Sequence, residues 1–293
     1  MAAQNVAISA YRTSQTGIIR MIYAHDTQEP GIDAQTVKLD GAGETIRIAR
    51  IDMEAPWRWL SAGWSDLLAM PHIGLAYGAA VAAIAVGLWF GLGSIGWQSM
   101  MPALAGGFML IGPVLGVGLY EASRRREQGH EVRIGDVILA GFRSPDQLAL
   151  LGLALFLVFI AWVQIAFLLF MIFFGGAPFP PIDDFIPRLL FTWQGVSLLV
   201  VGTLAGAMLA ALVFAMSVIS APMLIARRVG VASAVIASLN ATRINLKPMA
   251  LWAALIAGFV AIGIATLSLG LIVIFPLIGH ATWHAYREIA GRE

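Results

Sequence analysis

Long stretches without charged side chains dominate the pattern of this chain. Four of them, 67–120, 147–182, 189–226 and 248–286, contain no Asp, Glu, Lys or Arg. An α-helix needs about 20 apolar residues to cross a bilayer, and a charge at its centre costs at least about 2.5 kcal/mol. The first stretch therefore holds two helices, and a tight hairpin near Gly270 divides the last. The pattern predicts six membrane-spanning helices, at about 72–92, 99–120, 148–173, 193–220, 248–267 and 270–286.

The basic residues predict the orientation of these helices. All but one of the 18 Lys and Arg residues fall on one side of the six-span arrangement, and the exception is Arg188, beside Asp183 and Asp184. Loops rich in Lys and Arg stay in the cytoplasm. We therefore expect a multi-pass protein of a bacterial inner membrane with both termini cytoplasmic.

The spans pair into three similar hairpins, in units of about 55–126, 132–228 and 231–288. Each unit begins with a short stretch whose apolar residues have helical spacing, as in an amphipathic helix lying in the interface. These residues are Trp57, Leu60, Trp64 and Leu67, then Ile134, Val137, Ile138 and Phe142, then Val231, Val235 and Leu239. Pro113 precedes Arg124 by the same interval as Pro276 precedes Arg287. We interpret the units as copies of one hairpin.

These patterns predict an all-α, polytopic membrane helix bundle of six transmembrane helices in three hairpins, each preceded by a short amphipathic interfacial helix. The six-span membrane domain covers 46–290, and 1–45 forms a polar N-terminal tail. Residues 45–51 alternate between polar and apolar side chains as a strand does, but one strand does not make a domain.

Composition agrees with a membrane protein: 59% of residues are hydrophobic and only 12% are charged, against about 25% charged in soluble domains. The formal net charge of +1 gives no reason to expect nucleic-acid binding. The chain has no cysteine, which excludes disulfides and thiolate metal sites. The expected partners are the lipid bilayer and other membrane proteins.

Four segments carry a resemblance to a known family: Ala55-Pro-Trp-Arg-Trp-Leu, Gly106-Gly-Phe-Met-Leu-Ile-Gly-Pro, Leu119-Tyr-Glu-Ala-Ser-Arg and Gly279-His-Ala-Thr-Trp-His-Ala-Tyr-Arg. They resemble the domain-of-unknown-function 2189 family of uncharacterised polytopic bacterial membrane proteins, over residues 45–290. Some members are labelled putative cytochrome c oxidase subunit. The resemblance implies membrane location and six spans, and it transfers no catalytic residues. With five histidines, this chain is at best an accessory of such an oxidase.

Two histidines are the candidate cofactor ligands. His280 and His284 lie one helical turn apart and face the same way, as two imidazoles do when they share a metal or bind haem. Glu121 occupies the position equivalent to His284 in the first unit, so it could join them. The alternative is that His280 bonds a neighbouring carbonyl and His284 lies at the headgroup level. No cofactor is predicted, and haem or a metal at these histidines stays an alternative.

Other chemistry has little support in the sequence. No charged residue lies inside a span, where ion-coupled carriers usually keep one. Gln164, Thr203, Ser217 and Ser220 are the candidates for a polar path. No Ser–His–Asp set is expected, because the spans separate most of the histidines from the acids. We therefore expect no enzymatic activity.

Small and basic residues suggest packing and lipid contacts. Glycine pairs at four-residue spacing favour close helix packing, at Gly74 and Gly78, Gly112 and Gly116, and Gly202 and Gly206. Five arginines are candidates for binding anionic headgroups: Arg124, Arg125, Arg126, Arg227 and Arg228. Three hypotheses remain: a non-enzymatic accessory or scaffold of the inner membrane, a small-solute or lipid transporter, and a haem- or metal-binding protein.

Overall fold

The computed structural model describes residues 34–38, 45–142, 145–175 and 180–291. The chain divides into two units, Met1–Ala34 and Gln35–Glu293, and almost every described residue belongs to the second. Most of the predicted tail, 1–45, lies outside the described residues.

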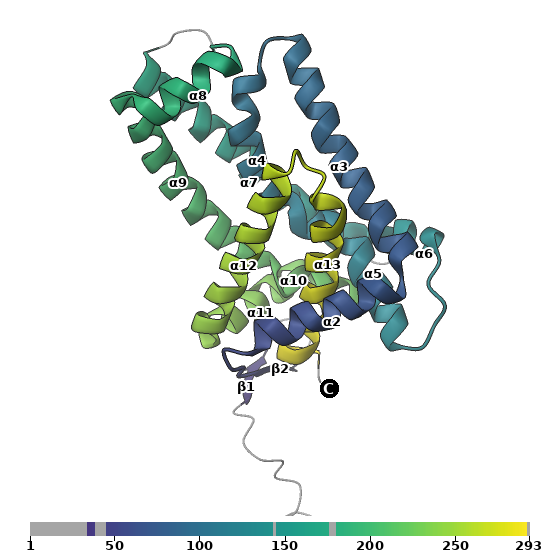
Figure 1. The fold of residues 1–293 in the computed structure, drawn as a ribbon. Helices are drawn as coiled ribbons and strands as arrows, with labels where there is room; N and C mark the ends of the chain where they lie inside the picture. Colours follow the sequence, from purple (N-terminus) through teal and green to yellow (C-terminus); the bar gives the residue numbers. More distant parts are fainter. Residues whose placement is uncertain (1–33, 39–44, 143–144, 176–179, 292–293) are drawn as a thin grey trace, which may run out of the picture. The chain divides into compact units, whose positions relative to one another are not determined.

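The second unit is a helical bundle, as predicted (Figure 1). The first hairpin contains α2 (Ala55–Ala69), α3 (Pro71–Ser94), the 3-10 helix η1 (Gln98–Met100), α4 (Met101–Leu115) and α5 (Val117–Glu127). The second contains α6 (Ile134–Ile138), the 3-10 helix η2 (Leu139–Phe142), α7 (Pro145–Phe174), α8 (Ile182–Phe191), α9 (Trp193–Ser217) and α10 (Ser220–Ala226). The third contains α11 (Val231–Ile244), α12 (Leu246–Ala265) and α13 (Leu271–Ile289). A helix thus precedes each hairpin.

Five helical segments of the described residues are long and apolar enough to cross a membrane by length and composition. They are Pro71–Ser94, Gln98–Glu127, Pro145–Phe174, Trp193–Ala226 and Leu246–Ala265. The sixth predicted span, 270–286, corresponds to α13, which is not among them. Polar side chains from His280 onward lower the hydropathy of α13, so the expected count of six is not confirmed.

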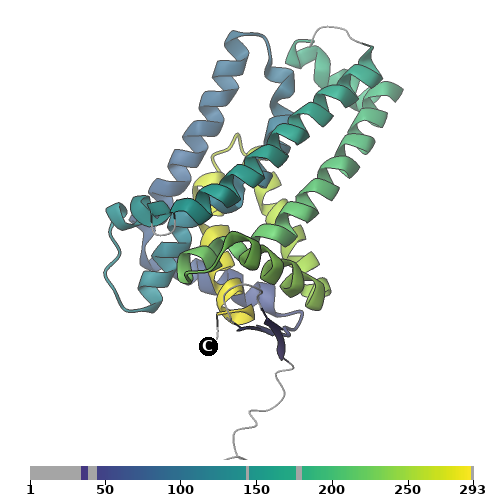
Figure 2. The same ribbon diagram turned by 180° about the vertical axis from the view of Figure 1, so that it is seen from behind.

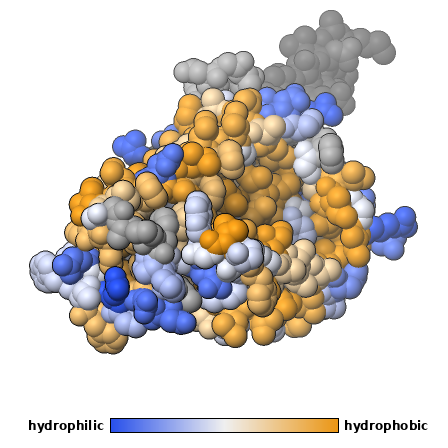
Figure 3. Space-filling model, turned by 90° about the horizontal axis from the view of Figure 1, so that it is seen from above, coloured by the Kyte–Doolittle hydropathy of each residue, from blue (hydrophilic) through white to orange (hydrophobic). Residues whose placement is uncertain are grey.

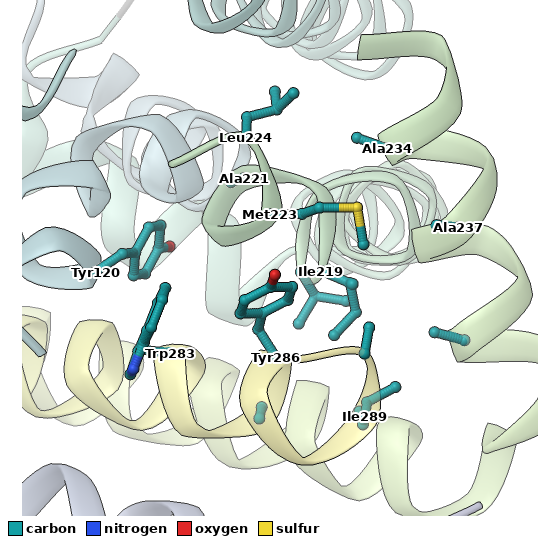
Figure 4. Packing of buried hydrophobic residues seen from close by; sticks show 14 of the residues in the cluster. Tyr120, Ile219, Ala221, Met223, Leu224, Ala234, Ala237, Trp283, Tyr286 and Ile289 are labelled. Carbon is teal, nitrogen blue, oxygen red and sulfur yellow. The ribbon is translucent and has the colours of Figure 1, made fainter. Parts of the chain in front are cut away.

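We call the end of the bundle that carries α2, α5, α11 and the last turns of α13 the base, and the end that carries η1 and α8 the far end (Figures 1 and 2). Figure 4 shows the core of the base, where α10 lies between α13 and α11. Met223 and Leu224 of α10 are fully buried there, with Trp283 and Tyr286 of α13. The base is therefore packed like the interior of a soluble domain.

A short two-stranded sheet also belongs to the base. Strand β2 (Thr45–Ala49), which the alternating pattern predicted, pairs with β1 (Ala34–Lys38). Ile46 and Ile48 of β2 are fully buried in the same core. Asn245, between α11 and α12, accepts a hydrogen bond from Ile51 N and donates one to Ala49 O, both at 3.0 Å. The chain just before the first hairpin is thereby joined to the third.

The turn between α12 and α13 lies well short of the far end in both ribbon views (Figures 1 and 2). Its two leucines point outward, with Leu267 82% and Leu269 61% exposed. The turn nevertheless satisfies much of its own backbone: Thr266 Oγ1 accepts from Gly270 N at 2.9 Å and donates to Gly263 O at 2.8 Å. A tight hairpin here was predicted. Because this third hairpin is short, the long helices in the far half of the bundle are α3, α4, α7 and α9.

Candidate functional site

A buried polar cluster at the base joins three helices that are far apart in sequence. Asp66 of α2 is 2% exposed, Ser123 of α5 is 1% exposed and His280 of α13 is fully buried. Ser123 Oγ lies 2.5 Å from Asp66 Oδ2 and 2.8 Å from His280 Nδ1. His284 Nε2 lies 2.9 Å from the same Asp66 oxygen, and Arg126 pairs with Asp66 Oδ1.

The hydrogen positions in this cluster follow from what each group can donate. An ionised carboxylate only accepts, so Ser123 donates to Asp66, and His280 Nδ1 must then donate to Ser123 Oγ. This assignment leaves the lone pair on His280 Nε2. That atom is buried and has no hydrogen-bond partner in the described structure, and it faces α3, where a Cβ added at Gly74 would lie 3.8 Å away.

The electrostatics of the cluster favour a charged Asp66. Burial raises the pKa of this carboxyl group, but the hydrogen bonds from His284 and Ser123, together with the electrostatic attraction of His284 and His280, hold the pKa below its ordinary value of 3.8. Asp66 is therefore an anion with donors on both oxygens. Its chemistry at the base is to hold α2, α5 and α13 together.

A second acidic side chain organises the arginines of α5. Glu121 is fully buried and pairs with Arg124 and Arg125 at 2.8 Å each. Arg125 also pairs with Asp136 of α6 at 3.0 Å. The sequence had suggested that Glu121 could join the two histidines. In the structure, the carboxylate that reaches them belongs to Asp66.

The contact between α2 and α13 continues along both helices. Glu288 Oε2 accepts from Trp59 Nε1, and Glu288 Oε1 pairs with Arg58, each at 2.7 Å. Between this pair and Asp66, Gly63 lies against the backbone of Ala281, so closely that an added Cβ would lie 2.6 Å from Ala281 N. The absence of a side chain at Gly63 thus sets the spacing at which the polar pairs form.

One expectation about this region is wrong. No Ser–His–Asp set was expected, yet Ser123, His280 and Asp66 are hydrogen-bonded neighbours because the base brings α2, α5 and α13 together. Ser123 is shielded and already donates to Asp66, so its hydroxyl is not placed as an accessible nucleophile. Asp66 lies on the buried side of α2. Trp57 and Trp64 of the expected apolar face are half-exposed.

Sequence reasoning had missed Asp66 and Ser123. A signal was present for Asp66 alone: it follows Trp59 and Gly63 at helical spacing, and a small residue beside a large one marks a contact face. Ser123 had no comparable signal.

The structure places the two candidate cofactor ligands in different roles. His284 Nε2 is bound to Asp66, whereas His280 keeps an uncommitted nitrogen. No group of three or more His, Asp or Glu residues that could hold a metal occurs in the described ranges. Haem or metal binding at His280 and His284 stays a prediction.

Two adjoining hollows lie between the helices. The larger, about 440 Å³, is lined by α4, α7, α8 and α9 and includes Ser99 and Trp162. The smaller, about 280 Å³, reaches towards the base between α4, α9 and α12. Both are lined almost entirely by apolar side chains and share Met109, Ala207, Ala210 and Ala257. Seen from above, the recessed surface between the helices is hydrophobic (Figure 3).

The predicted packing glycines fall into three groups. A Cβ at Gly74 or Gly78 would collide with Leu67 or with the backbone of Ile272, respectively. A Cβ at Gly116 or Gly206 would lie near a ring, of Tyr120 or Trp162. Added Cβ atoms at Gly112 and Gly202 would meet nothing within 4 Å, because these two glycines line the hollows.

The remaining candidates are dispersed. Arg124, Arg125 and Arg126 are paired with acids of the base, Arg227 donates to Ala290 O at 3.2 Å, and Arg228 is exposed. Ser217 and Ser220 donate to carbonyls of their own helical turns, Val213 O and Met216 O, at 2.6 Å each. Gln164 is exposed, and Thr203 lines the larger hollow. These polar residues form no continuous polar path in the described structure.

Comparison with known proteins supports the family resemblance. Residues 100–226 match the model of a family described as "Predicted integral membrane protein (DUF2189)". No curated protein and no solved structure matches this chain. The family match and the apolar helices identify an integral membrane protein.

Proposed function

We propose that this protein is a non-enzymatic accessory or scaffold component of the bacterial inner membrane, with its base in the cytoplasm. One observation carries the proposal: the polar cluster around Asp66 holds helices of the base together, while the hollows are lined almost entirely by apolar side chains. A closed polar cluster offers no route for a polar solute. Apolar helix surfaces instead suit contacts with lipid and with the helices of other membrane proteins.

The orientation rests on charge. The arginines of α5 gather at the base, and Arg188 lies in α8 at the far end. By the positive-inside rule, this distribution of charge supports a cytoplasmic base. Labelling of single cysteines, introduced at Gln128 and at Asp183, tests this orientation. A reagent that cannot cross the membrane should label position 183 in intact cells, and labelling at position 128 instead would overturn the orientation.

The accessory role is tested by isolation from native membranes in a mild detergent. We expect a membrane protein complex to purify with the chain in constant proportion, and respiratory complexes are the first to examine. The control is a variant in which exposed far-half side chains become smaller, Phe90→Ala with Met208→Ala, whose residues are 71% and 75% exposed. If no other protein purifies with the chain in constant proportion, the proposal is contradicted.

A lipid transporter is the second candidate, and the apolar hollows favour it over a small-solute transporter. It requires lipid to pass between leaflets. Vesicles containing the purified protein and a fluorescent phospholipid test this directly, by bleaching of the label from outside. Bleaching of all the label, where protein-free vesicles lose only the outer half, would favour the transporter over the accessory role.

A further inference from the structure

The larger hollow has the size and lining of a ligand site. Its volume of about 440 Å³ is within the range of about 300–1,000 Å³ typical of small-molecule pockets. An apolar cavity of about 150 Å³ already excludes water and accepts benzene. The hollow therefore has room for a longer hydrocarbon, and the adjoining hollow extends it towards the base.

Trp162 makes the inner wall rigid. Its ring lies against Gly106, Gly107 and Gly206, and its Nε1 donates to Ala103 O at 2.7 Å. The ring cannot swing into the hollow without breaking that bond. The wall on the far side comes from α8, where Phe185 and Leu189 are buried and Phe185 contacts Phe170 of α7 with ring centroids 6.3 Å apart.

Two polar hydroxyl side chains, Ser99 and Thr203, line this apolar space, and Ser99 is the buried one. Ser99 of η1 is 5% exposed, and its buried Oγ has no hydrogen-bond partner in the described structure. A buried hydroxyl without a partner costs about 1–3 kcal/mol. Ser99 lies in the turn between α3 and α4, at the far end, where a spanning helix reaches the headgroup layer. It is therefore a hydrogen-bond donor at the depth where lipid ester carbonyls lie.

The short third hairpin explains why the space is open. Since the turn between α12 and α13 stops well short of the far end (Figures 1 and 2), the far half has no helices in the place that α12 and α13 fill near the base. Side chains of α9 face outward beside this space, and Leu204 and Met208 are 62% and 75% exposed. In a bilayer, acyl chains fill any space of this kind that is open to them.

We propose that the hollow lined by α4, α7, α8 and α9 binds one acyl chain of a bilayer phospholipid, with Ser99 donating a hydrogen bond to an ester carbonyl of that lipid. The chain runs from Ser99 past Trp162 and Gly202 towards Gly112. The site goes beyond the accessory role, because it holds lipid whether or not another protein is bound.

Two substitutions fill the proposed site without a collision at the backbone. Because a Cβ at Gly202 meets nothing within 4 Å, Gly202→Leu occupies the larger hollow. Gly112→Leu occupies the adjoining one for the same reason and serves if Gly202→Leu does not fold. Gly87→Leu is the matched control, since its Cβ also meets nothing and Gly87 lines neither hollow.

The experiment measures phospholipid retained by the full chain. Protein in detergent is loaded with a phosphatidylethanolamine bearing ester-linked chains or with its ether-linked analogue, then washed, and the bound lipid is quantified by mass spectrometry. We expect Gly202→Leu to retain at least about fivefold less lipid than wild type and Gly87→Leu to match wild type. Wild type should prefer the ester lipid by about fivefold, the scale of one hydrogen bond, and Ser99→Ala should lose that preference.

Other results would overturn the proposal. Equal retention by wild type and by folded Gly202→Leu or Gly112→Leu places the lipid elsewhere. Equal retention of ester and ether lipids by wild type removes Ser99 from the site. A third outcome is that a polypeptide purifies with wild type but not with Gly202→Leu, while lipid retention is unchanged. The hollow would then bind a helix of a partner protein instead of lipid. None of these results depends on the accessory role, which the native isolation tests separately.

Discussion

Asp66 at the base and Ser99 at the far end are both buried polar side chains, but their surroundings differ. Asp66 receives hydrogen bonds from Ser123, His284 and Arg126, within a densely packed core. Ser99 has no partner in the described residues and borders a hollow. Buried polar groups are normally satisfied. The comparison indicates that the polar groups of the base bind one another, whereas the far half, within the described ranges, keeps an unpaired hydroxyl beside an apolar hollow.

The largest effect should come from removing the charge at the centre of the base. Asp66→Ala leaves Arg126 and His284 without their acceptor, and breaking a buried pair costs about 3–5 kcal/mol. We expect about 3 kcal/mol, because Arg126 is partly exposed. Unfolding in nanodiscs, followed by tryptophan fluorescence, measures the loss. Asp52→Ala, at a side chain 63% exposed, should change little, and equal losses for the two variants would show that the cluster is not structural.

The same substitution at two glycines should have opposite effects. Gly63→Ala forces α2 away from α13, because the added Cβ would lie 2.6 Å from Ala281 N, and overpacking costs about 1–3 kcal/mol. Gly202→Ala meets nothing and should gain up to about 1 kcal/mol from the better helix propensity of alanine. Melting temperatures of the two variants decide the matter. If both variants shift the same way, the base and the far half do not differ in packing.

The pH dependence of stability should trace to the base. Because the pKa of Asp66 is lowered, its ionised form contributes stability that is fully present above the ordinary value of 3.8. This contribution is lost as the pH falls through the lowered pKa. We expect the stability gap between wild type and Asp66→Asn to shrink from about pH 5 to about pH 3. A gap that stays constant across this range would assign the acid sensitivity to other carboxyl groups.

The smallest effect should follow from Ser99→Ala. Loss of a hydroxyl that has no partner within the chain removes a buried unsatisfied group, so the delipidated protein should be unchanged or slightly more stable, by up to about 1 kcal/mol. The lipid-loaded protein should instead lose part of its stabilisation by lipid. Melting temperatures with and without phospholipid separate the two effects. A clear loss of stability in the delipidated variant would indicate a partner within the chain.

Much of the fold could be predicted because the bilayer constrains single side chains. Charge-free stretches located α3, α4, α7, α9 and α12, and the alternation after Thr45 located β2. The number of spans could not be predicted from charge-free stretches in the same way, and six is not confirmed. The difficulty is α13, which combines an apolar first half with a polar second half that packs against α2. The mean hydropathy of α13 is therefore low for a membrane span. Whether this helix is buried in the protein depends on the helices that pack against it, which are encoded elsewhere in the chain.

The candidate site was only half visible in the sequence. The spacing of His280 and His284 placed both on one side of a helix, and both do join one cluster, His280 through Ser123 and His284 through Asp66. Their partners, Asp66 and Ser123, lie 218 and 157 residues away along the chain, and no local pattern connects positions so distant. The hollows were equally hidden, since the glycines that line them have the same spacing as those that pack closely.

The sequence separation between Asp66 and His284 has a consequence for synthesis. Ribosomes add about 5–20 residues per second, so the 218 residues between the two side chains take roughly 10–45 s to translate. Until α13 emerges, Arg126 is the available cation for Asp66, and the base cannot close. The base is thus completed only after α13 has been made, and nascent chains stalled before it would be targets for membrane proteases.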